Sequence, residues 1–258
     1  MSSRLIRVWQ IVLLGTALFA VGAASAKSIR FVTEPLPPYT YLNGDKVDGP
    51  MAQVLMSACA RLAWDCELKI MPWRRSLQTL KNGHADGIFM LHENSDRRRN
   101  YFMSPNIIVG RYVVFERIGM RFEYKDQGSL AGHTVGAYGP SGTSQTLNEI
   151  ASRHGVDVQI ESDNVTVLRK LVFGRYGNDG LALMNEAVGL YLLKHENLEG
   201  LQEAGEVEQF HYGIGLSRRS MTAQLSQQFN KVITEMCVSG DISQILARFE
   251  MPASPCNP

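Results

Sequence analysis

The residues between positions 72 and 105 have the types and the order that would bind an anion. A helix is predicted for residues 74–81, and a strand for residues 85–91, which form a near-continuous apolar run. Such a run is typical of a parallel strand that is covered on both faces. Residues 92–99 are polar and cationic and are expected to form a loop after that strand. Because open α/β sheets bind ligands at the carboxyl ends of their strands, a cationic loop there would hold an anionic group, most simply a carboxylate.

The residue order W…L..G.ADG…N.D.R…..F.SP in this segment resembles the signature of the family 3 extracellular solute-binding proteins, periplasmic receptors for amino acids and similar solutes. Members typically read L..G..D…..T..R…..FS.P, and the resemblance implies that the Arg pairs with the α-carboxylate of the solute. The matching residue, seven positions before Ser104, is Arg97, and a one-residue gap would select Arg98. A planar guanidinium can hold a carboxylate through two parallel hydrogen bonds. The alternative is a solvated charge run over residues 97–99.

The same resemblance implies that an aromatic residue after the first strand stacks against the solute. Tyr39, in the loop that follows the predicted strand 28–33, fits this position best, and Tyr41 is second. Trp73, after the second predicted strand, is expected to form another wall of the site. Aromatic faces suit an apolar or cationic part of a ligand. Packing within the core or the loop is the alternative role for each of these side chains.

A second loop, residues 139–144, leads into a helix predicted for residues 143–154. Hydroxyls and free backbone N–H groups at a helix N-terminus suit an anion. The resemblance implies that this loop contacts the solute carboxylate from a second lobe, with Thr143 as the best match and Ser144 or Ser141 as alternatives. Thr143 is also the candidate N-cap of the helix. The loop lacks the G-K-[ST] sequence of a phosphate-binding loop, so a nucleotide site is not expected.

The position that matches the ammonium-binding Asp of the family's amino-acid receptors is Asn185, beside Glu186. An amide oxygen can accept a hydrogen bond but supplies no full countercharge. Two binding interpretations follow: either Glu186 replaces the Asp, or the solute is a carboxylate that lacks the ammonium group. A helix cap is a further interpretation of Asn185.

The N-terminus predicts a signal peptide over residues 1–26, cleaved after Ala26 in an A-x-A motif. Arg4 and Arg7 precede an apolar stretch at residues 11–21 that is short for a membrane span. A periplasmic location is therefore expected. Cleavage removes two Arg and no acidic residue, which changes the formal charge from +1 to −1. That balance argues against nucleic acid as a partner.

Four cysteines lie in the mature part of the chain, where an oxidising compartment permits disulfides. We expect the pairs Cys59–Cys66 and Cys237–Cys256, mainly because neighbours in sequence meet easily, while the other two connectivities stay open. A zinc site is not expected, since no C-x-x-C motif or paired His accompanies these cysteines.

The mature sequence alternates predicted strands and helices, which is typical of an α/β protein with largely parallel sheets. The resemblance implies a two-lobed, type II periplasmic-binding-protein-like fold in which two crossover strands, at residues 110–117 and 209–216, form the hinge. Lobe 1 would begin with residues 27–118, lobe 2 would comprise residues 119–208, and residues 209–258 would return to lobe 1. The ligand is expected in the cleft between the lobes, which would close by hinge motion.

We therefore expect a periplasmic receptor that captures a small, polar, carboxylate-bearing solute, an amino acid or a related molecule, for an ABC permease. It would act as a monomer, need no cofactor or metal, and catalyse no reaction. One alternative is an enzyme on the same scaffold, because some relatives are dehydratases; Glu93 or Glu186 would then act as acid or base. The other is a sensor that presents its bound state to a separate periplasmic signalling partner.

Overall fold

The computed structural model describes residues 28–93 and 95–255, in which strands and helices alternate along the chain. The predicted signal peptide, residues 1–26, lies outside the described residues. The strands of the main sheet are β1 (Ile29–Thr33), β4 (Cys66–Ile70), β5 (Gly87–His92), β6 (Tyr101–Met103), β7 (Ile108–Arg117), β8 (Thr134–Tyr138), β9 (Asp157–Glu161), β10 (Leu181–Asn185) and β11 (Leu201–Ser217). A separate hairpin consists of β2 (Tyr41–Asn43) and β3 (Lys46–Asp48).

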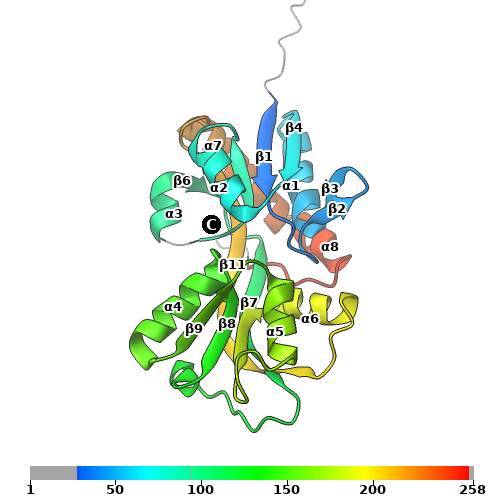
Figure 1. Ribbon diagram of the computed structural model, residues 1–258. Coiled ribbons are helices and arrows are strands. Elements are labelled where there is room, and N and C mark those ends of the chain that lie inside the picture. The colour runs from blue at the N-terminus through cyan, green and yellow to red at the C-terminus, as the bar shows by residue number, and fades with distance from the viewer. Residues whose placement is uncertain (1–27, 94, 256–258) are drawn as a thin grey trace, which may run out of the picture.

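The helices cover the sheet in two groups that make up two lobes (Figure 1). In the first lobe they are α1 (Pro50–Arg61), α2 (Trp73–Lys81), α3 (Ser95–Asn100), α7 (Ala223–Val238) and α8 (Asp241–Ala247). In the second lobe they are α4 (Gly142–His154), α5 (Asn164–Val172) and α6 (Glu186–His195). This arrangement is the predicted mixed α/β, two-lobed fold. The predicted lobe boundaries, near residues 118 and 209, remain a proposal.

The sheet runs through both lobes in the order β4-β1-β5-β11-β7-β10-β8-β9, and β6 pairs beside β11. Strands β4, β1 and β5 are parallel and form the first lobe, while β10, β8 and β9 are parallel and form the second. The two groups are joined by β7 and β11, which pair antiparallel with each other. The two lobes are therefore connected by the chain itself and also by the backbone hydrogen bonds between β7 and β11.

The second crossover strand is longer than predicted, because β11 begins at Leu201 rather than near residue 209. Its first half is rich in exposed Glu and shifts register twice against β7, near Gly205 and near Val207. These irregularities interrupt the two-residue alternation of a strand, which explains why the sequence pattern identifies only the second half.

The basic segment after β5 is not the predicted loop, because residues 95–100 form the short helix α3. Asp96 lies in its first turn and Arg97 to Arg99 lie in its last turn, an order of charges that complements the helix dipole. Six residues are too few to show a helical period of apolar residues. The sequence therefore shows a charged segment here but gives no sign that it is helical.

The predicted disulfide between Cys59 of α1 and Cys66 of β4 is present. Cys237 of α7 is also disulfide-bonded, but its predicted partner, Cys256, lies outside the described residues. Among the residues that the structure describes, none of the helices combines the length and the apolar character needed to cross a bilayer.

Gly87 allows β1 and β5 to pair closely in the first lobe. A Cβ at this position would lie 2.3 Å from Cε1 of the fully buried Phe31. We expect Gly87→Ala to lower the free energy of unfolding by about 1–3 kcal/mol, measured by urea denaturation. Gly128→Ala is the control, because its added Cβ would approach the exposed carboxylate of Asp126 at 3.0 Å and the ring of His154 at an ordinary contact distance of 3.7 Å. A Gly87→Ala protein as stable as wild type would contradict this account of the packing.

Candidate functional site

A cavity lies between the two lobes, beside the paired crossover strands. Its volume of about 30 Å³ has room for one or two water molecules. This cavity is too small for a solute of amino-acid size, but an open groove of about 610 Å³ between α2 and α4 shares Trp73, Arg97 and Ser141 with its lining. The first lobe contributes Glu34, Leu36, Trp73, Met90, His92 and Arg97 to the lining. The crossover strands contribute Tyr112 and Tyr212, and the second lobe contributes Tyr138, Ser141, Gly142, Thr143, Asn164 and Asn185.

Arg97 is the cationic residue of this lining. It lies on α3, directly after the carboxyl end of β5, and its Nη1 donates a hydrogen bond to the carbonyl oxygen of His92. The guanidinium carbon lies 5.8 Å from the ring centroid of Trp73. Burial lowers the pKa of Arg97, although the group stays cationic at neutral pH. A half-buried guanidinium at the mouth of a cleft is suited to an anionic ligand.

The two neighbouring arginines of α3 are exposed and do not line the cavity. The Arg98 side chain is 69% exposed, and its Nε lies 3.0 Å from Oε1 of Glu93. Arg99 is similarly exposed and pairs with Asp96 at 3.0 Å. Of the three candidates, Arg97 alone lines the cavity. Its role as the carboxylate anchor remains a prediction, and Arg98 has no support from its position.

Trp73 and Tyr39, the two predicted aromatic contacts, occupy different places. Trp73 begins α2 and lines the cavity. Tyr39 is turned into the core, where its ring packs edge-on against Tyr212 with centroids 5.5 Å apart. The backbone turns back between Leu36 and Thr40, which directs Tyr39 inward and leaves Leu36 in the cavity wall. The predicted stacking role of Tyr39 therefore has no support in this arrangement.

The loop before α4 separates the roles of its hydroxyl groups. Ser141, rather than Thr143, is the N-cap, and it forms a reciprocal capping box with Ser144. Ser144 is therefore engaged locally, whereas the buried Thr143 lines the cavity. Burial raises the pKa of Tyr112, and a hydrogen bond with Thr143 opposes that rise. Of the three predicted hydroxyl residues, Thr143 and Ser141 line the cavity, and Ser141 is engaged in the helix cap, so the contact of Thr143 with a ligand remains the prediction.

Gly142 brings the start of α4 against the crossover strand. A Cβ on this residue would lie 2.4 Å from the hydroxyl oxygen of Tyr112 and 3.3 Å from Nδ1 of His92. Only glycine permits this close approach of the second lobe to the cavity. Burial lowers the pKa of His92 to about 4, so the imidazole is neutral at pH 7.

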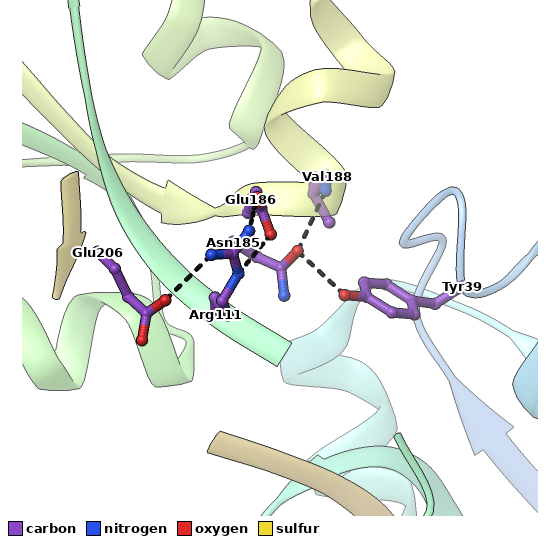
Figure 2. A network of polar contacts seen from close by, with 6 residues as sticks. All are labelled: Tyr39, Arg111, Asn185, Glu186, Val188 and Glu206. Carbon is purple, nitrogen blue, oxygen red and sulfur yellow. Dashed lines mark hydrogen bonds and ion pairs between the residues drawn. The ribbon is translucent and has the colours of Figure 1, made fainter. Parts of the chain in front are cut away.

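Asn185 and Glu186 are adjacent in sequence but serve different partners (Figure 2). Asn185 is the N-cap of α6, and its Oδ1 accepts hydrogen bonds from Val188 N at 3.1 Å and from the Tyr39 hydroxyl at 3.3 Å. Glu186 is held through both carboxylate oxygens by Arg111, which also bonds Glu206 at 3.0 Å. Asn185 lines the cavity and Glu186 does not.

Glu34 is a cavity residue that the sequence interpretation missed. Its Oε2 accepts a hydrogen bond from the Tyr138 hydroxyl at 2.8 Å, which joins the first lobe to the second. Burial raises the pKa of Glu34 to about 7, against the opposing effects of Tyr138 and Arg97. The sequence signal for Glu34 is its position directly after the first strand. The interpretation of this loop instead favoured its aromatic residues as ligand contacts. Among the described residues, no cluster of three His, Cys, Asp or Glu side chains could hold a metal ion.

The raised pKa of Glu34 predicts a pH dependence of stability. Because the folded protein holds this proton more tightly than the unfolded chain, stability should fall as pH rises from 4.5 towards 7. The loss attributable to Glu34 is at most about 3 kcal/mol. We expect Glu34→Gln to remove it, as measured by urea denaturation of both proteins between pH 4.5 and 8.

Tyr138→Phe supplies the matched comparison for Glu34. It retains the carboxyl group but removes the hydrogen bond that lowers its pKa, so the pH-dependent loss should extend to higher pH. An unchanged pH profile in Glu34→Gln would show that another group causes the dependence.

The fold resembles several solved structures at low sequence identity. A histidine kinase sensor domain with similarity to periplasmic binding proteins matches with a TM-score of 0.76 and 18% identity, over 86% of this chain and 95% of that one. An ancestral arginine-binding protein bound to arginine gives 0.74 and 22%, over 86% and 97%. The arginine-, lysine-, histidine-binding protein ArtJ from Geobacillus stearothermophilus gives 0.74 and 18%, over 88% and 97%.

No curated protein sequence matches the chain significantly. The family profile of the bacterial extracellular solute-binding proteins, family 3, matches residues 29–251, nearly all of the described chain. Proteins of this family are generally binders rather than enzymes. The chain therefore belongs to the bacterial extracellular solute-binding proteins of family 3.

Proposed function

We propose that this protein is a periplasmic receptor that captures a small carboxylate-bearing solute between its lobes and delivers it to an ABC permease. Membership of family 3 supports the capture of a small molecule. The position of Arg97 carries the more specific proposal, because this cation lines an interlobe cavity directly after a parallel strand of the sheet.

The cavity residues suggest how a carboxylate would bridge the lobes. Arg97 belongs to the first lobe and Thr143 to the second, and both line the same cavity. A carboxylate has two oxygens, so it can accept hydrogen bonds from a guanidinium and a hydroxyl together. These contacts can form together only when the lobes are closed, and the ligand would therefore favour closure through its greater affinity for the closed form.

A sensor is the second candidate function. The similarity to a histidine kinase sensor domain favours it, since the same fold serves signalling in that protein. Both functions require a closed, ligand-bound form and differ in the partner that recognises it. Loss of solute uptake on deletion of the gene would favour transport, whereas loss of a transcriptional response with normal uptake would favour sensing.

An enzymatic function has little support from the carboxylates predicted to serve it. Glu186 is held by Arg111, and Glu93 pairs with the exposed Arg98. A thermal-shift screen of the mature protein against amino acids, organic acids and polyamines would identify stabilising ligands. Each stabilising ligand should be recovered chemically unchanged after incubation with the protein; its conversion would identify an enzyme instead.

The central prediction concerns Arg97. We expect Arg97→Ala to weaken binding of the stabilising carboxylate at least about 30-fold, because it removes a charged partner from a partly buried site. Arg97→Lys should also weaken binding, since an ammonium cannot form the paired hydrogen bonds of a guanidinium. Isothermal titration calorimetry measures both effects.

Arg98→Ala is the matched control for Arg97. It removes an exposed arginine from the same helix, and its affinity should remain within about threefold of wild type. Circular dichroism and urea denaturation check that each variant is folded. Retained affinity in folded Arg97→Ala, with loss in Arg98→Ala, would show that the other arginine is the anchor.

A further inference from the structure

We infer that Asn185 makes the cavity selective for carboxylates that carry an oxygen acceptor next to the carboxylate, such as a hydroxyl or a carbonyl, over the corresponding amino acids. The inference rests on the proposed function, because it names the class of carboxylate that the same cavity would bind.

The first support is the hydrogen-bonding state of the Asn185 amide. Its Oδ1 already accepts two hydrogen bonds, from Val188 N and from the Tyr39 hydroxyl (Figure 2). A carbonyl oxygen has two lone pairs, so this oxygen has no further capacity for an ammonium group. What Asn185 still offers to a ligand is its N–H₂ group.

The second support is that this N–H₂ group is buried without a hydrogen bond of normal geometry. Asn185 is 5% exposed, and its Nδ2 makes only a weak contact, with the Tyr212 hydroxyl, whose pKa that contact lowers against the larger effect of burial. A buried donor without a good acceptor is unfavourable. Since Asn185 lines the cavity, a ligand oxygen placed there would satisfy this donor, whereas an ammonium would oppose it with further donors.

The third support is the position of the nearby acidic groups. Glu186, the sequence alternative for an ammonium-binding carboxylate, is held by Arg111 through both oxygens and does not line the cavity. Glu34 is the carboxyl group of the cavity lining, and it accepts a hydrogen bond from Tyr138. Burial disfavours its ionised form, so near neutral pH much of the population carries a proton and acts as a donor.

The lining therefore combines a guanidinium and an amide N–H₂, which only donate hydrogen bonds, with hydroxyls that can donate or accept. Arg97, the amide of Asn185, and the hydroxyls of Thr143, Tyr112 and Tyr212 all line the cavity. An anion with additional oxygen acceptors matches such a lining better than a zwitterion, whose ammonium requires acceptors.

Matched ligand pairs provide the test. Isothermal titration calorimetry of the mature protein would compare malate with aspartate, lactate with alanine, and 2-oxoglutarate with glutamate. In the pairs that bind, we expect wild type to bind the oxygen-bearing member at least about tenfold more tightly. Preference for the amino member would overturn the inference.

Asn185→Asp is the decisive variant. It retains the size of the side chain and a good N-cap for α6, but it replaces the amide donor with a carboxylate oxygen. We expect the order of affinities within each pair to reverse or become equal. Glu186→Gln is the control and should leave the wild-type order unchanged, since that side chain lies away from the cavity. An unchanged order in folded Asn185→Asp would overturn the inference.

Asn185→Ser is the second variant, for use if the aspartate protein does not fold. Serine also caps helices, and its hydroxyl can donate or accept, so the preference should shrink towards equality. An undiminished preference would again contradict a role for the amide.

The outcomes also separate this inference from the proposed function. If amino acids bound tightly and this binding depended on Arg97, the receptor function would be supported. The proposed selectivity for oxygen-bearing carboxylates would be overturned. If that binding were lost in Glu34→Gln and unaffected in Asn185→Asp, Glu34 would be the countercharge for an ammonium. Binding of neither member of any pair by wild type would overturn the selectivity, whereas the receptor function would be overturned only if no carboxylate of the thermal-shift screen stabilised the protein.

Discussion

The pairing of β7 with β11 is the constraint on which the rest of the structure depends. Its register places Tyr112 opposite Glu208, while on the other edge of β7 the same residue pairs with Asn185 of β10. Tyr212 of β11 pairs with His92 of β5. One ladder thus brings residues from both lobes to the cavity. Because a slip of one residue turns each side chain to the opposite face of a sheet, the hydrophobic faces of both lobes protect the geometry of the site.

Two side-chain hydrogen bonds join the lobes across the cavity, among the contacts of the described residues. Tyr39 bonds Asn185, and Tyr138 bonds Glu34, so each bond joins one lobe to the other. A hydrogen bond within a protein contributes a net of about 1 kcal/mol. Two such bonds are offset by the burial of Glu34 and Arg97, both of which are charged in water.

The sequence predicts the elements of this fold well where hydrophobic periodicity is strong. The parallel strands and the main helices follow from local patterns, and Cys59–Cys66 follows from proximity, whereas the short helix that carries Arg97 does not follow from its pattern. The orientation of Tyr39 does not follow either, because it depends on the turn that begins at Leu36. The pKa of Glu34 is equally inaccessible, since it depends on burial by residues of both lobes. Local pattern locates a side chain in the sequence, whereas tertiary packing decides which way it faces.

The pair Asn185 and Glu186 shows why this distinction matters for function. From the sequence alone, Asn185 is the matching position, and Glu186 beside it is the alternative that carries a charge. The N-cap geometry of α6 turns Asn185 towards the cavity, and Arg111 holds Glu186 on the scaffold between β7 and α6. Arg111 also bonds Glu206 of β11. Through Arg111, Glu186 therefore helps to connect the crossover strands to the second lobe. The charged side chain thus connects the crossover strands to the second lobe, while the neutral amide lines the cavity.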